Sequence, residues 1–291
     1  MDISKVSEER RAILAKIEQY EREGRFDEDV ENDPPAPELL PDKVDYLCKK
    51  PSSKFKRWLA NLIGDRFFLG WIKKGIVLID GVTGEEHLAA LKEGAVVTCN
   101  HFSVADNYIV FHLIRKYLPK KYLYKIIREG NYTNFPGLFG FLMRHCNTLP
   151  LSSNRRTMMN FMSATNTILK EGNTVLIYPE QGMWWNYRKP RPYKIGGFKI
   201  AYRAGVPVVP TFITMRDDEK LGPDGYPMQW HTLHVMPPIY PDKSLGEKAG
   251  AQKMLEEAYA ACKAKYEEVY GVPLVYTTEK TDESPKKEGE K

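Results

Sequence analysis

Short apolar runs alternate along this chain with longer segments whose apolar residues repeat at helical spacing, and this alternation limits the fold more than any other feature. A short apolar run is typical of a buried strand, and strands that alternate with helices favour a largely parallel sheet. We therefore predict an α/β fold, with a mixed, largely parallel sheet flanked by helices. The predicted strands are residues 76–80, 95–99, 122–127, 174–178 and 206–214, and the predicted helices between them are residues 106–117, 137–145, 155–170 and 195–203.

The two ends of the chain add further elements. Ser7 can cap a helix that runs to about Glu23 and ends at Gly24, and the proline-rich residues 33–42 predict a linker that lays this N-terminal helical arm against the body. The other predicted elements are a helix through Leu91 that begins at a capping box of Thr83 and Glu86, an edge strand over residues 228–236, and a last helix over residues 246–270.

Charge is distributed unevenly along the chain. Residues 1–45 hold 7 basic and 14 acidic residues, whereas residues 49–74 hold 8 basic residues and 1 acidic residue. Clustered cations of this kind either bind phosphates of a nucleic acid or a lipid surface, or form a solvated charged face. We predict four parts: an acidic helical arm with its linker over residues 1–45, a basic amphipathic interfacial segment over 46–75, a catalytic α/β domain over 76–276, and a disordered tail over 277–291.

The sequence predicts a cytoplasmic protein that meets a membrane only at its surface. The four cysteines show no paired spacing, which favours a reducing compartment over a disulfide framework or a zinc site. No run approaches the roughly 20 apolar residues of a membrane-spanning helix, and the first residues lack the apolar core of a secretory signal. We expect a peripheral location on the inner face of the cell membrane.

Residues 54–74 combine aromatic and aliphatic side chains with cations at both ends. Trp58 and Trp71 stand among these apolar residues, and such a pattern is typical of a helix, or two short helices broken near Gly64, that lies in a bilayer interface. The alternative is an ordinary amphipathic helix whose apolar face packs on the core.

His101 and Asp106 follow a buried apolar strand, separated by four residues. Catalytic groups in open α/β sheets gather at the carboxyl ends of the strands, so this pair lies where chemistry is expected. If the chain turns into the next helix with Asp106 in its first turn, the carboxylate can orient the imidazole as a general base. On its own, this common spacing favours a structural or surface histidine over a catalytic one.

Four blocks in order resemble those of the glycerolipid and lysophospholipid acyltransferases, the family that includes bacterial 1-acylglycerol-3-phosphate acyltransferase. The blocks are NHFSVAD (100–106), which is similar to the family's NHxSxxD; GFLMRHCNTLPLSS (140–153), which keeps Arg144 and Pro150; YPEQGMW (178–184), which keeps Pro179 and Glu180; and VPVVPTF (206–212). Arg128 and Glu129 also resemble the family's basic and acidic pair before the second block.

The resemblance implies an acyltransferase in which the free hydroxyl of a lysophospholipid attacks the thioester of acyl-CoA or acyl carrier protein, with no metal, no cofactor and no acyl-enzyme. His101 would remove the hydroxyl proton and Asp106 would orient it. The acceptor-pocket or site-shaping residues carried over from the blocks are Asn100, Ser103, Arg128, Arg144, Glu180 and Gly182. Glu180 would either bind an acceptor hydroxyl or order a loop.

Two family arginines that are associated with the acceptor phosphate are absent, because their positions hold Met183 and Ser153. Either nearby cations replace them, or the acceptor headgroup is uncharged or larger. The candidate replacements are Arg155, Arg156, Arg188, Lys189, Arg191 and Lys194, of which Arg188 and Arg191 are the preferred site residues. The aromatic residues of 183–193 would contact headgroups, wall an acyl tunnel or pack on the body.

Other functional signals are weaker. His231 and His234 lie three residues apart on a predicted strand and so face opposite sides, which disfavours a metal site. The basic stretches accompany no nucleic-acid-binding module, and no GxSxG motif indicates a serine hydrolase. Two hypotheses remain: an active acyltransferase of membrane phospholipid synthesis or remodelling, and a peripheral membrane-binding protein that keeps the scaffold with lost or altered activity.

Overall fold

The computed structural model describes residues 3–31, 33–120 and 122–278, and in these residues a seven-stranded sheet has the order β1-β7-β6-β2-β5-β3-β4. Strands β2 to β6 run parallel to one another, β7 is antiparallel to β6, and β1 is parallel to β7. The sheet is therefore mixed and largely parallel, as predicted. The strands are β1 (Leu78–Thr83), β2 (Ala95–Thr98), β3 (Leu123–Ile127), β4 (Thr148–Pro150), β5 (Thr174–Ile177), β6 (Val208–Leu221) and β7 (Pro227–Val235).

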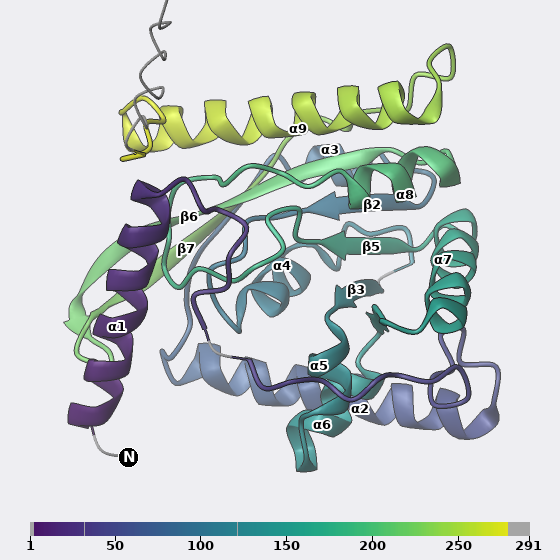
Figure 1. Cartoon of the computed structure of the whole chain (residues 1–291), viewed down its shortest axis with the longest axis horizontal. Helices are drawn as coiled ribbons and strands as arrows, with labels where there is room; N and C mark the ends of the chain where they lie inside the picture. The colour runs from purple at the N-terminus through teal and green to yellow at the C-terminus, as the bar shows by residue number, and fades with distance from the viewer. Residues whose placement is uncertain (1–2, 32, 121, 279–291) are drawn as a thin grey trace, which may run out of the picture.

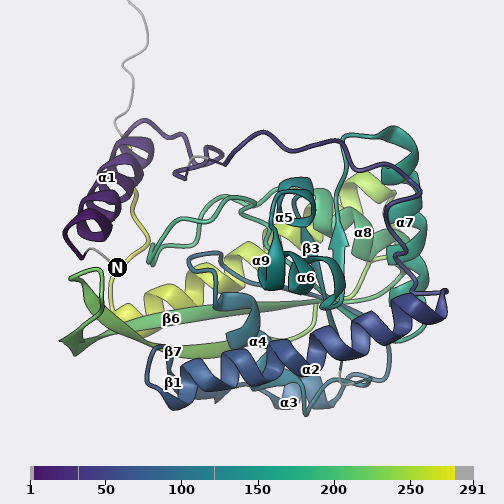
Figure 2. The same ribbon diagram turned by 90° about the horizontal axis from the view of Figure 1, so that it is seen from below.

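Helices cover both faces of the sheet (Figures 1 and 2). Helices α7, α8 and α9 pack on one face, and α2, α3 and α4 contribute to the apolar cluster on the other. The described helices are α1 (Ile3–Arg22), α2 (Pro51–Lys73), α3 (Glu86–Ala89), α4 (Asp106–Ile114), α5 (Glu129–Thr133), α6 (Gly137–His145), α7 (Arg155–Lys170), α8 (Gly196–Ala204) and α9 (Glu247–Tyr270). None of them is long and apolar enough to cross a membrane.

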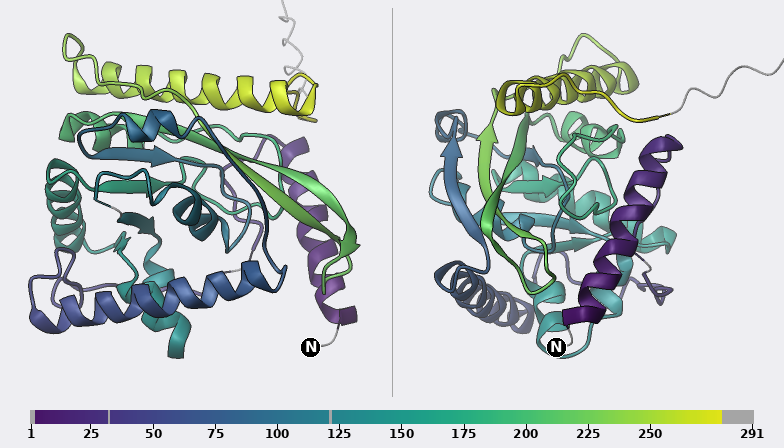
Figure 3. Two further views of the ribbon diagram at one scale, coloured as in Figure 1. Left: turned by 180° about the vertical axis from the view of Figure 1, so that it is seen from behind. Right: turned by 90° about the vertical axis from the view of Figure 1, so that its left-hand side faces the viewer.

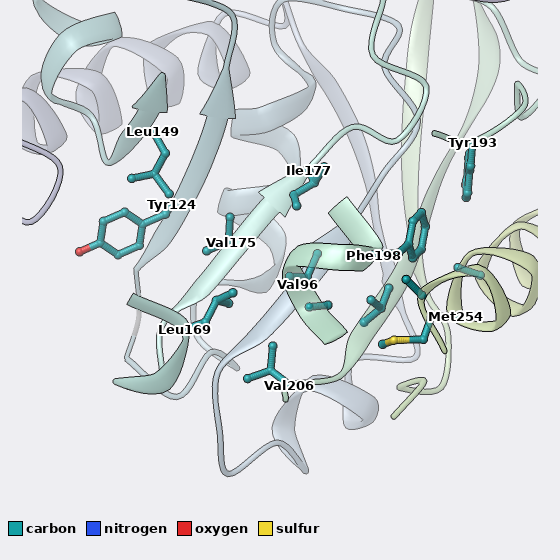
Figure 4. Packing of buried hydrophobic residues seen from close by; sticks show 14 of the residues in the cluster. Val96, Tyr124, Leu149, Leu169, Val175, Ile177, Tyr193, Phe198, Val206 and Met254 are labelled. Carbon is teal, nitrogen blue, oxygen red and sulfur yellow. The ribbon is translucent and has the colours of Figure 1, made fainter. Parts of the chain in front are cut away.

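The two apolar clusters explain why the central strands have no polar face. Successive residues of a strand point to opposite sides, and in β2 Val96 joins the cluster with α7, α8 and α9 whereas Val97 joins the cluster with α4. Both side chains are fully buried. Figure 4 shows Val96 in the first cluster, near Phe198 of α8 and with Met254 contributed by α9. Burying one such side chain stabilises the fold by about 1.5–3 kcal/mol.

Three sequence predictions about element ends were wrong. Ser7 does not cap the first helix, because α1 begins at Ile3 and the Ser7 hydroxyl donates to the Asp224 carbonyl at 2.7 Å. Thr83 ends β1 and its hydroxyl bonds the His234 ring at 2.9 Å, so it caps no helix, and α3 is a single short turn. Tertiary hydrogen bonds to β7 and to the β6–β7 turn take both hydroxyls in place of local capping.

Of the two alternatives predicted for residues 54–74, the single helix is confirmed, whereas the predicted edge position of β7 was wrong. Residues 51–73 form one continuous helix with no break at Gly64, because that glycine is buried where α2 meets α6 and a side chain there would lie 3.2 Å from Cys146 Sγ. Strand β7 is not at an edge, since it lies between β1 and β6, and β1 and β4 are the edges.

The N-terminal arm packs against the rest of the chain, and Figure 3 shows α1 beside the end of the long β6–β7 hairpin. Ile17 and Tyr20 of α1 form a third apolar cluster with Val30 and Trp184. The linker then follows the body, where Leu39 N donates to a Glu129 carboxylate oxygen at 2.7 Å. Most of the predicted tail, residues 279–291, lies outside the described residues.

Candidate active site

The candidate site lies at the carboxyl ends of β2 and β5, which are adjacent parallel strands. His101 follows β2 after two residues, and Glu180 follows β5 after two. In Figures 1 and 3 the arrowheads of both strands point toward the side of the molecule on which α1 lies. The chain thus delivers side chains from two loops to one edge of the sheet, as expected for an open α/β fold.

His101 and Asp106 form a hydrogen bond of 2.6 Å between Nδ1 and Oδ2. Asp106 is in the first turn of α4 and fully buried, while 22% of the His101 side chain is exposed. The same carboxylate oxygen accepts from Phe102 N at 3.1 Å and from Ser103 N at 3.3 Å, so the turn itself supplies donors that orient this carboxylate. When the carboxylate accepts this bond, Nδ1 is the donor, and the neutral imidazole has Nε2 as its acceptor.

Tyr178 completes the surroundings of this pair, and the sequence analysis did not single it out. Its hydroxyl donates to Asp106 Oδ1 at 2.6 Å, and its ring stacks on the His101 imidazole with centroids 4.1 Å apart. Burial, together with the Asp106 charge, holds the pKa of the Tyr178 hydroxyl well above its usual range, so the phenol stays a donor. The available signal was its place at the end of a buried strand, immediately before Pro179 and Glu180.

Glu180 makes the contacts of a residue that orders a loop. One carboxylate oxygen accepts from His101 N at 3.3 Å and from Arg191 Nη2 at 3.2 Å, and the other accepts from Arg191 N at 2.9 Å. Glu180 and Arg191 are both buried. Burial raises the pKa of Glu180 and lowers that of Arg191, and their mutual attraction opposes both shifts. Of the two roles predicted for Glu180, the hydrogen bonds fit loop ordering.

Asn100 and Ser103 use their polar atoms within the scaffold. The Asn100 amide bonds both the N–H and the C=O of Ile213, at 2.8 and 3.0 Å, and so ties the end of β2 to β6. The Ser103 hydroxyl accepts from Ala105 N at 3.2 Å within the turn that leads to α4. Both residues adjoin His101 or Asp106 and shape the turn between them.

Four of the six predicted replacement cations pair with a carboxylate, and Lys189 is one of them, bound to Glu21 at 2.5 Å. Arg188 binds Asp217 at 2.6 Å, Arg191 binds Glu180 in the interior, and Lys194 binds Asp27. Arg191 also packs over Trp184, with its guanidinium carbon 4.6 Å from the ring centroid. Buried Trp184, one of the aromatics of 183–193, packs against Ile17, Tyr20 and Val30 of the N-terminal arm rather than on the body.

Arg128 and Gly182 lie together beside the N-terminal arm. The Arg128 guanidinium binds Asp29, and an added side chain at Gly182 would lie 3.0 Å from Asp29 Oδ1. Arg144 is placed differently. It lies on α6, donates to the Phe135 carbonyl at 3.1 Å, and lines a cavity of about 220 Å³ with Arg57 of α2.

The two histidines of β7 have structural partners. The His231 ring bonds the Leu78 carbonyl at 2.8 Å and stacks on Phe102, and the His234 ring is held between the hydroxyls of Thr83 and Thr214, each at 2.9 Å. Across residues 3–31, 33–120 and 122–278, no group of three or more potential metal ligands is found.

Comparisons with known proteins agree with this geometry. Residues 81–214 match the family Acyltransferase. The chain is 30% identical over 182 residues to a 1-acyl-sn-glycerol-3-phosphate acyltransferase of Chlamydomonas reinhardtii, covering 62% of this chain and 51% of that protein. It is 29% identical over 145 residues to a chloroplastic 1-acyl-sn-glycerol-3-phosphate acyltransferase of Brassica napus, covering 50% of this chain and 39% of the relative.

A solved structure shares the fold. The crystal structure of the 1-acyl-sn-glycerophosphate acyltransferase from Thermotoga maritima matches with a TM-score of 0.50 and 22% identity, covering 76% of this chain and 82% of that one. The chain spans about half, or less, of the length of the two sequence relatives.

Proposed function

Residues 81–214 of this chain belong to the acyltransferase family, and from that premise we propose that the protein transfers a fatty acyl group from acyl-CoA or acyl carrier protein to the free hydroxyl of a lysolipid. The observation that carries the proposal is the 2.6 Å bond between His101 Nδ1 and the buried Asp106 carboxylate. The acceptor belongs to the lysolipid class that includes 1-acylglycerol-3-phosphate, the substrate for which both sequence relatives are named.

The geometry supports general-base catalysis. His101 Nε2 takes the proton of the acceptor hydroxyl as its oxygen attacks the thioester carbonyl, and Asp106 stabilises the imidazolium that forms. The carbon–sulfur bond then breaks, the acyl group remains on the acceptor oxygen, and the imidazolium returns its proton to the leaving thiolate. Tyr178 and the amides of residues 102 and 103 hold the Asp106 side chain in place, since each donates to its carboxylate.

We also propose that the protein works on an anionic membrane surface, in keeping with the predicted location at the inner face of the cell membrane. Phe55 and Trp58 of α2 are about 60% exposed and lie beside each other, with ring centroids 5.8 Å apart. Leu138 and Phe139 of the neighbouring α6 are also exposed. The exposed cations on and just after α2 are Lys54, Lys56, Arg66, Lys73 and Lys74. Apolar and cationic groups on one element suit an interface with anionic lipid.

The deciding experiment is thioester turnover with a panel of lysolipids. We expect the purified protein to release free thiol from acyl-CoA or acyl carrier protein and to form the acylated lipid, and we expect His101→Ala to lose both while staying folded. His87→Ala, a change on the short helix α3, is the matched control and should retain turnover. If a folded parent acylates no acceptor of the panel, the protein belongs to the alternative class, a scaffold without this activity.

A further inference from the structure

Carboxylates of the N-terminal arm lie on the cations that surround the candidate site. Residues 21–33, here called the acidic strap, hold seven acidic and two basic residues. Three cations that follow β3 and β5 each bind an acidic residue of the strap: Lys189 binds Glu21 at 2.5 Å, Lys194 binds Asp27, and Arg128 binds Asp29 and Asp33. These cations follow the carboxyl ends of β3 and β5, which is the edge of the sheet at which His101 also lies.

The pairing of Asp29 with Arg128 has the geometry of phosphate recognition. Both terminal nitrogens of the guanidinium donate to Asp29, Nη1 to Oδ2 at 2.7 Å and Nη2 to Oδ1 at 2.6 Å, and Nη1 also donates to Asp33 at 3.3 Å. A guanidinium fork binds a carboxylate or a phosphate in this same bidentate way. Asp29 therefore occupies the donors of Arg128 that a phosphate would use.

The pair adjoins the catalytic histidine through one loop. Arg128 Nη2 and Asp29 Oδ1 both lie against Gly182. On one side of Gly182 the Glu180 carboxylate accepts from His101 N at 3.3 Å, and on the other side Trp184 N donates to the His101 carbonyl at 3.1 Å. Through Gly182, the Asp29–Arg128 pair thus lies against the loop that bonds the main chain of His101.

Apolar packing holds the strap in place. Val30 is 3% exposed, and Phe26 stacks on Trp184 with ring centroids 5.9 Å apart. The Trp184 indole N–H donates to the Glu28 carbonyl at 3.0 Å, and the Arg191 guanidinium donates to the Phe26 carbonyl at 3.1 Å. Asp29 is therefore carried by a packed segment of the chain.

We propose that Asp29 is a specificity-determining residue that takes the place of an acceptor phosphate on Arg128, so that the protein prefers lysolipids without a phosphate monoester, such as monoacylglycerol. A phosphate monoester would meet an Arg128 whose two terminal nitrogens already bind carboxylates, and the negative charges of Asp29 and Asp33 would repel it. A neutral headgroup leaves the existing pairs intact. The inference rests on the proposed acyl transfer and names the acceptor class for it.

The test compares lysophosphatidic acid with monoacylglycerol as acceptors. We expect the parent to favour monoacylglycerol in kcat/KM by at least about tenfold, and the D29N/D33N double variant to raise the ratio of lysophosphatidic acid to monoacylglycerol by at least about tenfold, mainly through KM. Adding Arg128→Gln to that variant should abolish the gain. Asp80→Asn, which removes an exposed partner of Arg216, is the control and should leave the ratio at the parent value. If the double variant does not fold, Asp29→Ala replaces it, since Phe26 and Val30 still hold the strap.

The outcomes separate this inference from the proposed function. A parent that prefers lysophosphatidic acid, with a ratio that D29N/D33N leaves unchanged, overturns the role of Asp29 while acyl transfer stands. If no acceptor is acylated, the proposed function fails. Calorimetry with inorganic phosphate then still tests whether Asp29 takes the place of a phosphate on Arg128. Tighter phosphate binding by D29N/D33N than by the parent supports it, and equal binding overturns it.

Discussion

At the scale of single residues, the Asp106 carboxylate accepts four hydrogen bonds, from the His101 ring, two backbone amides and the Tyr178 hydroxyl. An acceptor-only group suits this position, because every neighbour is a donor. The role that follows for Asp106 is to hold the Nδ1–H tautomer and to stabilise the imidazolium, which makes it a positioning residue.

Asp106→Asn tests this positioning role. An amide has one donor end and no charge, so it sets one N–H against the donors now bound and favours the wrong His101 tautomer. We expect kcat to fall by about 10²–10⁴ with a smaller change in the acceptor KM. Steady-state kinetics with circular dichroism as the folding check measures this. In the His101→Ala background, Asp106→Asn should lower the residual kcat only slightly further. If it lowered kcat there by the same factor as in the parent, Asp106 would act independently of His101.

Tyr178→Phe removes a single hydrogen bond. The ring still stacks on His101, but one buried oxygen of Asp106 loses its donor, which costs about 1–3 kcal/mol where the carboxylate is charged. We expect kcat to fall by about 10-fold or more while the melting temperature drops by a few degrees. Tyr117→Phe is the matched control, because it also removes one tyrosine hydroxyl from a carboxylate, in this case from Glu85 instead of Asp106. Parent-like turnover by a folded Tyr178→Phe would show that the Asp106 charge needs no help from the phenol.

Sequence predicts the residues that follow strands at this site but not their partners. His101, Asp106 and Glu180 were identified because each sits at a short, fixed distance after an apolar run or in a recognisable block. Asp29 was not identified from the sequence, because it lies 99 positions from Arg128 and no local pattern connects the two residues. For the same reason the sequence offered Arg188 and Arg191 as replacement cations, while only the fold shows the carboxylates that bind them.

At the scale of elements, α2 combines two kinds of surface. Trp71 and Ile72 pack against the apolar cluster beneath the sheet, whereas Phe55 and Trp58 at the other end of the helix remain exposed. Core packing therefore belongs to the C-terminal end of α2, and the exposed rings that suit membrane docking lie at its N-terminal end. The prediction that Trp71 would serve as an anchor has to be revised, and the exposed end carries the docking proposal.

We predict that Phe55→Ala with Trp58→Ala weakens binding to anionic vesicles by at least about tenfold, because the two exposed rings are lost from the interface. Co-sedimentation with liposomes measures the binding, which should also fall as salt screens the cations of α2. Leu221→Ala with Val275→Ala removes two exposed apolar side chains elsewhere and serves as the control. Equal sedimentation of parent and α2 variant would refute docking through this end of the helix.

At the scale of the whole molecule, the alternation of apolar runs and helical segments was enough to predict the layers, and most helices and strands lie within a few residues of their expected bounds. Strand order was not predictable in the same way. Strand β7 lies inside the sheet because β1, far earlier in the chain, adds to its outer side. That pairing depends on long-range contacts, as does the hydroxyl of Thr83 that bonds β7 across the same junction.

The junction between β1, β6 and β7 also predicts how the whole fold responds to acid. His234 is buried between two threonine hydroxyls, and burial, with Lys265 of α9 nearby, lowers its pKa from the ordinary value near 6.5 to about 4. Below pH 6.5 the unfolded chain binds a proton at this position that the folded chain does not, so stability is lost as the pH falls from about 6.5 to 4.

We expect His234 to account for a loss of about 1–3 kcal/mol in the free energy of unfolding over that range, since one pKa unit corresponds to about 1.4 kcal/mol and partial solvent access reduces the effect. Urea unfolding of parent and His234→Gln at pH 7 and pH 4.5 measures it, because the difference between the two proteins cancels the other titrating groups. The difference in free energy of unfolding between parent and variant should be smaller at the lower pH, because the variant has no imidazole to protonate on unfolding. His87→Gln on the outer helix α3 is the control, and a gap that stays constant with pH would contradict the role given to His234.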